Sequence, residues 1–528
     1  MANMALIPVA SAADLERQAK EGSEKLQQET YIQELAAHVR KRWESAHIAK
    51  RDLEERMLQC VRQRNGEYDP SVKAEIKAQG GSDLFIQLTS VKCRAATSWL
   101  RDTLLGTGSD KPWSMDATPD PELPEEITQG LEGKLAQEIM QAMQSTGAMP
   151  EEEELAKIAN EMQDEARELA EEESERRIAR MERKMEDQLL EGGWYEAFNE
   201  FIEDVVTFPY AVMKGPVKRR RKVLKWSEGK LVPQEVIRNE WERVNPFDLY
   251  WAPWAWSIND GFVIERHRMT ADDLQTLVGV PGYNDDAIKT VLNDFNGGGL
   301  KEWLWVDSAR ATAEGKRPSE AVNNDDLIDA LQLWDSISGK LLVEWGVPED
   351  EIEDQTMNYP CEVWLIGSTV IRAVLNYDPI GRKPYYMTSY EAKPGSVDGK
   401  GVADLCRDSQ AMVNATSRAL ANNMGISSGP QVGVNISRLP AGEDISDMHP
   451  WKIWQFQASE YNDGSPPLSF FQPNSNAQEL MAVFEKFSER ADEDTMIPKY
   501  MTGGHTPGAG RTSSGLAMMI SNAGKGIK

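Results

Sequence analysis

Residue types that could do chemistry are scattered along the chain without the spacing that enzyme sites require. The four cysteines include no pair at CxxC spacing, which argues against a zinc knuckle and favours buried thiols in a reduced compartment: Cys60, Cys93, Cys361 and Cys406. The five histidines form no HExxH motif, and no GxxxxGK[ST] motif occurs. The sequence therefore predicts no catalytic residue, metal site or cofactor. An enzyme whose site assembles from distant segments is kept as a minor alternative.

One glycine-rich run near the end resembles a phosphate-binding loop at first sight. It lacks the lysine followed by Ser or Thr that holds the phosphates, and no strand leads directly into it. We interpret it as a flexible loop with glycine hinges. Its residues of interest are Gly503, Gly504, His505, Gly508, Gly510 and Arg511.

A strongly basic cluster lies in a segment that reads as a β-hairpin. Residues 209–244 contain β-branched runs around a Glu228-Gly229 turn. The cluster consists of Lys218, Arg219, Arg220, Arg221 and Lys222. It is either a solvated strand edge protected by charge, or a contact for DNA phosphates or for an acidic neighbour.

Composition limits the class of protein. A length of 528 residues suggests several domains, and 40% hydrophobic residues can build a core. The 86 Asp and Glu outnumber the 58 Lys and Arg and give a net charge of −28, so the overall field of the chain repels nucleic acid. No run of about 18 apolar residues predicts a membrane span. The N-terminus has no basic segment typical of a signal peptide.

Apolar spacing places the elements. Helices are predicted over 12–64 and over 82–105, the second with Ser82 as N-cap. The highly charged segment 125–191 predicts a long acidic helix that Gly192 and Gly193 end. This helix is either a surface or coiled-coil helix or a peripheral spoke beside copies of itself. After the hairpin the pattern predicts a helix from about Thr270, a strand-rich segment over 327–391 and a helix over 401–424. Short strands, a helix near 475–495 and a final helix from 512 follow. We expect this final helix to continue beyond residue 528.

Three segments together resemble the portal proteins of tailed bacteriophages, the ring at one capsid vertex through which DNA is packaged and ejected. They are VNPFDLYWAP over 244–253, GKGVADLCRDSQ over 399–410 with Asn414 beyond it, and MIPKYMTG over 496–503 followed by RTSSG over 511–515. Ala252 and Ser513 stand where the family more often has Asp and Ala. The acidic, helical N-terminal third is most similar to that of N4-like podoviruses.

The resemblance implies an α+β portal fold with a helical wing, two stem helices and a small α+β clip insertion, closed into a ring. It divides the chain into an N-terminal wing (1–268), a first stem helix (269–298), a clip (299–398), a second stem helix (399–425), further wing strands and a helix (426–495), and a tunnel-loop region that begins a C-terminal helix (496–528).

The resemblance also implies partners and a location. The chain would form a homododecameric ring around double-stranded DNA that it does not read in sequence. It would bind the terminase, a head-to-tail adaptor and the major capsid protein, with ejection proteins as further candidates, and it would need no membrane and no cofactor. It would be made in the bacterial host cytoplasm and end in the virion.

The candidate site residues follow from the same resemblance, and none is catalytic. Candidates for the channel are the residues of the glycine-rich loop together with Lys525. Candidates for the stem and the contacts between subunits are Val402, Leu405, Arg407, Asp408, Gln410, Asn414 and Arg418, and clip candidates are Trp334, Trp345 and Trp364. The alternative function is a non-enzymatic acidic helical scaffold of the virion, assembled through segment 150–191.

Overall fold

The computed structural model describes most of the chain. The described residues are 12–106, 113–116, 133–134, 137, 140, 152–227, 230–295, 305–315, 327–345, 349, 352, 354–376, 378, 380–438, 453, 455–457 and 466–499. Helices and strands are both abundant, which confirms the predicted α+β class.

A five-stranded antiparallel sheet forms the centre of the body, in the order β3-β4-β5-β6-β7. One face packs against α1 (Ala12–Asn65), whose Leu35, Val39 and Trp43 are buried with Tyr250 and Leu333 of the sheet. The other face is covered by α7 (Ala271–Thr276) and α8 (Asp285–Phe295). The strands are β3 (Leu249–Trp251), β4 (Val263–Thr270), β5 (Leu327–Ser338), β6 (Asn358–Ile366) and β7 (Thr369–Leu375).

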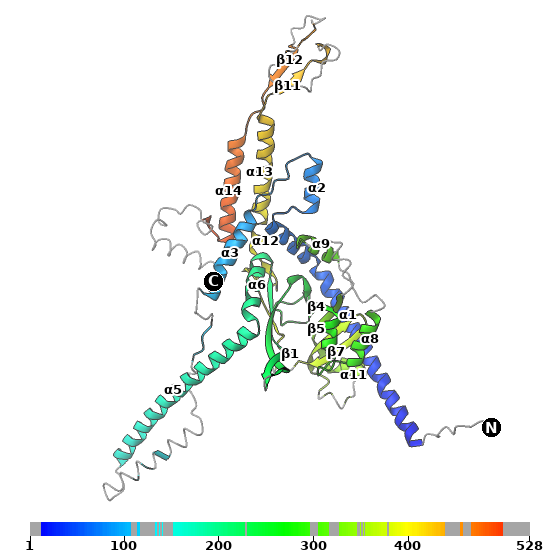
Figure 1. The fold of residues 1–528 in the computed structure, drawn as a ribbon, viewed down its shortest axis with the longest axis vertical. Helices are drawn as coiled ribbons and strands as arrows, with labels where there is room; N and C mark the ends of the chain where they lie inside the picture. Colours follow the sequence, from blue (N-terminus) through cyan, green and yellow to red (C-terminus); the bar gives the residue numbers. More distant parts are fainter. Residues whose placement is uncertain are drawn as a thin grey trace, which may run out of the picture.

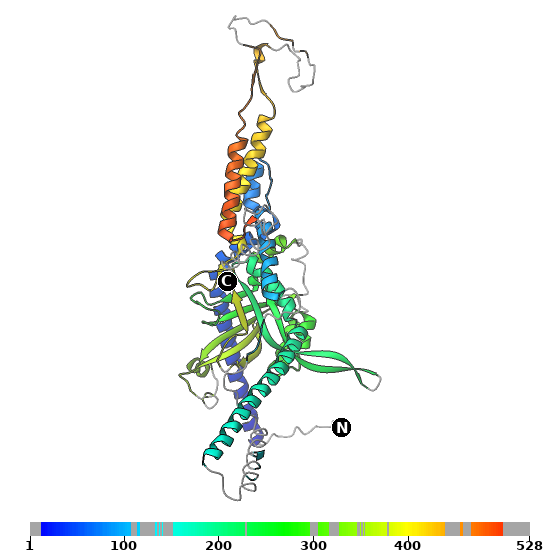
Figure 2. The ribbon, with the colours of Figure 1, turned by 90° about the vertical axis from the view of Figure 1, so that its left-hand side faces the viewer.

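A second sheet carries the predicted hairpin. Its strands are β1 (Ala211–Ser227), β2 (Lys230–Val244) and β8 (Tyr385–Thr388), in the order β2-β1-β8. β8 pairs with Ala211–Lys214 of β1, and in the described part of the chain no third strand flanks the outer part of the hairpin. The hairpin projects from the body in Figure 2.

Two further projections leave the body (Figure 1). The acidic helix is confirmed as α5 (Glu152–Glu191), and Gly192 and Gly193 separate it from α6 (Trp194–Thr207). At the opposite end, α13 (Arg407–Ser427) and α14 (Ala477–Thr495) lie side by side. They carry the strand pair β11 (Gln431–Val434) and β12 (Leu468–Phe471) beyond them. We call α13, α14 and this pair the arm.

The remaining elements are short or connect these parts. They are α2 (Pro70–Ala78), α3 (Leu88–Leu105), η1 (Pro246–Asp248), α9 (Trp305–Ala313), α11 (Gly339–Glu344), β9 (Glu391–Ala392), β10 (Gly399–Lys400), α12 (Val402–Leu405) and η3 (Ile436–Arg438). Within the described ranges, no helix combines the length and apolarity that crossing a lipid bilayer requires.

The single helix predicted over 269–298 is not formed. β4 continues to Thr270, α7 ends at Thr276, and α8 begins only at Asp285. Pro281 and two glycines with positive φ, Gly279 and Gly282, occupy the gap and cannot continue an α-helix. The expected cap is present, because Thr270 and Asp273 form a reciprocal capping box.

The predicted clip over 299–398 is not a separate insertion. β4, which precedes the segment, pairs along its whole length with Leu327–Trp334 of β5, and β6 and β7 extend the same sheet. The strand-rich character was predicted correctly. The pairing of β5 with β4 was not predicted, because pairing between strands about 60 residues apart leaves no local signal in the sequence.

The thiols give a direct test of this core. Cys60, Cys93 and Cys406 are buried in one cluster where α1, α3 and α12 meet, and burial raises the pKa of Cys93 and of Cys406 to about 12. Burial raises the pKa of Cys361 to about 12 as well, but its side chain is only partly buried, so a reagent can reach it in the native protein. We therefore expect iodoacetamide to modify Cys361 first and the other three only upon unfolding, as mass spectrometry of the labelled peptides would record. Equal labelling of all four in the native protein would contradict the packing.

Candidate functional site: the arm and its root

The arm meets the body at a dense junction, which we call the arm root. It comprises residues 398–414, the N-terminal segment 86–92 and the end of α14 near Ile497. It contains the predicted motif GKGVADLCRDSQ with Asn414, and the structure gives a physical reason for five residues of that pattern, namely Gly399, Gly401, Asp404, Gln410 and Asn414.

The two glycines of the motif are required by close backbone approach. A Cβ on Gly401 would lie 2.4 Å from the carbonyl oxygen of Phe208, and one on Gly399 would lie 2.3 Å from that of Glu391. Real Cβ atoms do not come so close to backbone oxygens, so any other residue forces the chain to shift. The glycines thus seat the start of the arm directly on the end of α6.

The aspartate of the motif is held by an arginine from α1. The Arg56 guanidinium donates to Asp404 at 2.7 Å, to Asp398 at 3.1 Å and to the carbonyl of Gly399 at 3.0 Å. Charge-assisted bonds from one guanidinium to several oxygens fix both distance and orientation. Arg56 therefore locks α1 to the residues that begin the arm.

Gln410 and Asn414 bind the segment that leads into α3. The amide oxygen of Gln410 accepts bonds from the backbone and hydroxyl of Thr89, both at 2.9 Å, and its amide nitrogen donates to the carbonyl of Ile86. Asn414 accepts from the backbone nitrogen of Ile86 at 2.9 Å.

These bonds correct the predicted start of the helix over 82–105. The residues from Ser82 to Gln87 are not helical, and the backbone N–H and carbonyl of Ile86 among them bond to Asn414 and Gln410 of α13, so α3 begins only at Leu88. Ser82 does not cap α3; its hydroxyl accepts a bond from the backbone of Leu84.

The returning helix is tied to the same root. Lys92 of α3 is buried and donates to Asp492 at 2.5 Å and to the carbonyl of Ile497. Tyr390 donates to the carbonyl of Thr495 at 2.9 Å. Both helices of the arm are therefore fixed where they enter the body, and among the described residues their outer ends lead to β11, β12 and η3.

The predicted stem residues divide into two groups. Val402, Gln410 and Asn414 are buried within one chain, and Leu405 is partly buried, so they position the arm and do not face a neighbouring subunit directly. Arg418 donates to the hydroxyl of Tyr68 at 2.7 Å. Arg407 and Asp408 are exposed, and a role for them between subunits stays a prediction.

A buried polar network stabilises the other predicted motif, VNPFDLYWAP. Lys50 of α1 donates to the carbonyls of Pro246, Phe247 and Leu249 at 2.7, 2.8 and 2.7 Å. Burial lowers the pKa of Lys50 to about 7, while nearby Glu54 and Asp248 favour its charged form. An ammonium has three N–H donors, and all three are used.

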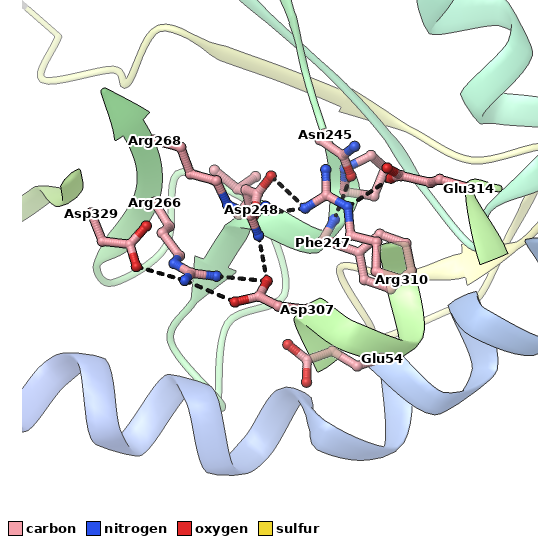
Figure 3. A network of polar contacts seen from close by, with 12 residues as sticks. Glu54, Asn245, Phe247, Asp248, Arg266, Arg268, Asp307, Arg310, Glu314 and Asp329 are labelled. Carbon is pink, nitrogen blue, oxygen red and sulfur yellow. Dashed lines mark hydrogen bonds and ion pairs between the residues drawn. The ribbon is translucent and has the colours of Figure 1, made fainter. Parts of the chain in front are cut away.

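The aspartate of this motif belongs to an adjoining ion-pair cluster that fixes α9 (Figure 3). Asp248 accepts from Arg310 of α9 at 2.9 Å. Arg266 of β4 bonds through both terminal nitrogens to Asp307 of α9, each at 3.0 Å, and to Asp329 of β5 at 2.8 Å. The cluster connects α9, β4, β5 and η1, and nothing in it resembles a nucleophile beside a base.

A third buried network joins the two sheets. Lys214 of β1 donates to Glu265 of β4 at 2.5 Å and to Gln332 of β5 at 2.7 Å, and Tyr385 of β8 donates to Glu265 at 2.7 Å. Burial alone would raise the pKa of Glu265, but Lys214 and His267 together hold it well below its usual range.

This low pKa predicts a pH dependence. Because the folded pKa lies below the unfolded value of about 4.3, ionised Glu265 stabilises the fold above that pH and loses its contribution as the pH falls through the folded pKa. The stability lost in Glu265→Gln should therefore be largest at neutral pH and shrink toward about pH 3. Urea unfolding at several pH values measures this difference. Half-exposed Glu391 supplies the control, Glu391→Gln, and a constant difference for Glu265→Gln would refute the assignment.

The other predicted site residues have different surroundings. Trp345 and Trp364 are buried in the body, against α1 and against the α7–α8 face, and Trp334 is partly buried, so core packing explains all three. The basic cluster lies on β1 of the projecting hairpin. The channel candidates, Gly503 to Arg511 and Lys525, lie outside the described residues.

Four residues of these networks were not predicted from the sequence: Lys50, Glu54, Arg56 and Arg266. A signal existed for the first two. They continue the helical spacing of Leu35, Val39 and Trp43, so charged residues occupy the buried stripe of α1. A buried charge must be paired, which marks such positions as parts of a network.

Comparison with known proteins places this architecture in a family. The profile of the phage SU10 portal protein matches residues 94–527, which include both motifs, the body sheet and the arm. No curated protein matches the chain. The match does not test the N4-like subtype, which stays a prediction. The chain therefore belongs to the phage SU10 portal protein family and is a portal protein of a tailed bacteriophage.

Proposed function

We propose that copies of this chain close into a dodecameric ring at one capsid vertex, and that double-stranded DNA passes through its centre during packaging and ejection. The family membership supports the ring. The arm, which is anchored at its root, is the observation that supports its use as a conduit with a docking end. A conduit needs a rigid protrusion that reaches partners outside the capsid. The arm, fixed at its root and free beyond it, has that form.

The arm is the best candidate for stem and clip. We assign α13 and α14 as the two stem helices and residues 428–476 between them as the clip. With 21 residues, α13 spans about 32 Å at 1.5 Å per residue. This assignment replaces the first stem helix expected over 269–298 and the clip expected over 299–398. It keeps the second stem helix close to its predicted bounds.

The charge of the chain suits a conduit. A net charge of −28 opposes adsorption of a polyanion, so DNA can slide past the walls. Guidance then needs only a few weak phosphate contacts, for which Arg511 and Lys525 remain sequence-based candidates. No readout of base sequence is expected, and none of the networks described above offers catalytic chemistry.

The outer end of the arm is the proposed docking surface for the terminase and later for the head-to-tail adaptor. Phe470, Phe471 and Ile436 expose more than half of their surface there, which is unusual for large apolar side chains. Aromatic residues that a partner covers often dominate binding.

Replacing Phe470 and Phe471 by serine tests this proposal. We expect rings to form normally in negative-stain images, because both side chains lie far from the root, while terminase binding falls at least tenfold and packaged DNA is lost. The control is Trp256→Ser, an equally exposed aromatic on the body, which should bind terminase normally. Unchanged terminase affinity in the double variant would show that docking lies elsewhere.

A further inference from the structure

The body carries an exposed apolar patch on two neighbouring loops. One loop, residues 252–262, joins β3 to β4, and the other, residues 376–384, joins β7 to β8. Trp254, Trp256 and Ile380 on these loops expose 63%, 77% and 71% of their surface. We call these three residues the tryptophan patch. Large apolar side chains grouped on a surface mark an interaction site.

The two loops hold each other in place, so the patch is preformed. Lys383 donates through Nζ to the carbonyls of Ile258 and Asn259, at 3.1 and 3.0 Å. Asp260 accepts from the backbone nitrogen of Ser257 at 2.8 Å, which closes a tight turn in the first loop. A preformed site binds a partner without the entropic cost of ordering its own loops.

A hollow of about 300 Å³ opens beside the patch, and its lining includes Arg42 and Trp254. Arg42 is paired there with Asp335 at 3.1 Å. The two loops have no net charge, because they contain two acidic and two basic residues, namely Asp260, Asp378, Arg382 and Lys383. An uncharged, apolar segment therefore fits the patch better than a charged one.

The chain contains an uncharged segment of this kind outside the described residues. Residues 1–11, MANMALIPVAS, have no charged side chain, whereas every other stretch of more than three residues outside the described ranges has at least one. Leu6, Ile7, Pro8 and Val9 form an apolar run around a proline. Extended segments that contain proline bind to surfaces lined by aromatic side chains.

This segment cannot reach the patch of its own chain. α1 is continuous from Ala12, and about 45 Å of helix separates Ala12 from Arg42, which borders the same hollow as Trp254. Leu6 lies at most about 22 Å from Ala12, even in a fully extended chain. Figure 1 shows the N-terminal part of α1 extending beyond the body. Only the patch of another copy is therefore within reach of the apolar run.

We infer that residues 6–9 of each subunit dock on the tryptophan patch of an adjacent subunit. This inference rests on the proposed ring and names one of its contacts. The two surfaces differ, as the heterologous interface of a closed ring requires. The apolar run and the patch then cover each other, and α1 connects one subunit to the next.

Disulfide cross-linking tests the contact. In a Cys361→Ser background, which leaves only the buried native thiols, Ile7→Cys is combined with Trp254→Cys or with Ile380→Cys. Oxidation should give a ladder of covalent oligomers up to the full ring on non-reducing gels. The matched control combines Ile7→Cys with Ile48→Cys, on α1, where the native side chain is 75% exposed, and should give no ladder.

The outcomes separate this inference from the proposed function. Rings in negative-stain images without a ladder, a ladder from the control pair as well, or a disulfide confined to one chain would overturn the contact and leave the ring intact. Absence of rings in the unmodified protein would instead overturn the proposed function, and this contact with it.

Ring dissociation on dilution supplies a second readout. Ile7→Asp and Trp254→Ser should each raise, at least tenfold, the subunit concentration at which half of the rings dissociate. Because both remove the same contact, the double variant should dissociate no more readily than either single variant. Asn3→Asp adds the same charge before the apolar run and should leave ring dissociation unchanged. Effects of the two single variants that add in full would show that Ile7 and Trp254 do not touch.

Discussion

Replacing Lys50 by methionine is expected to lower the free energy of unfolding by about 3–5 kcal/mol, the usual cost of removing one partner from a buried charged network. Methionine fills much the same volume but leaves the carbonyls of Pro246, Phe247 and Leu249 without their donor. It also leaves Glu54, whose pKa burial already raises, without its nearest positive charge. Urea unfolding followed by tryptophan fluorescence measures the change.

The matched control lies on the same helix. Lys41 is exposed, so Lys41→Met should change the free energy of unfolding by less than about 0.5 kcal/mol, as surface substitutions usually do. If the two variants were equally stable, the buried lysine would not hold the VNPFDLYWAP segment, and the explanation given for that motif would fail.

Replacing Gly401 by alanine is expected to loosen the arm root and to cost about 1–3 kcal/mol, the range for overpacking a well-packed site. The added Cβ would lie 2.4 Å from the carbonyl oxygen of Phe208, a backbone atom that cannot move without displacing α6. Because the root orients the arm, we also expect a large loss of infectious phage in a plaque assay.

Gly425 of α13 provides the opposite expectation. A Cβ there meets no atom within 4 Å, and its helical backbone suits alanine, so Gly425→Ala should stabilise the chain by about 0.5–1 kcal/mol. Thermal unfolding distinguishes the two variants by the sign of the shift. A Gly401→Ala protein as stable as the original chain would show that the close approach at the root is not constrained.

Local patterns predicted much of the fold. The apolar repeat of α1, the charged repeat of α5, the glycines between α5 and α6 and the two strands of the hairpin are all predicted from neighbouring residues, and these elements are confirmed. The turn predicted at Glu228-Gly229 lies outside the described residues. The elements that were predicted wrongly depend on contacts with residues far along the chain, or contain proline and glycine residues that end a helix. The segment 82–87 is not helical, because the backbone of Ile86 bonds to Gln410 and Asn414. The helix expected over 269–298 is divided by Pro281, which lies between two glycines with positive φ.

The site was predicted in part. The motif GKGVADLCRDSQ lies at the start of the second predicted stem helix, and its residues Asp404, Gln410 and Asn414 bond within one chain, while the contacts between subunits predicted for Gln410 and Asn414 stay a prediction. Their partners could not be read from the sequence, because Arg56, Ile86 and Thr89 lie more than 300 residues away along the chain. The clip was misplaced for a related reason: pairing with β4, and not composition, decides that β5 to β7 belong to the body.

Electron cryomicroscopy of the purified full-length chain tests the main proposal most directly. We expect closed rings of twelve subunits with an open centre wide enough for a double helix, and with every arm extending from the same side of the ring. Monomers, filaments or small bundles, or rings whose arms point outward from the rim, would contradict a DNA conduit with the arm as its stem.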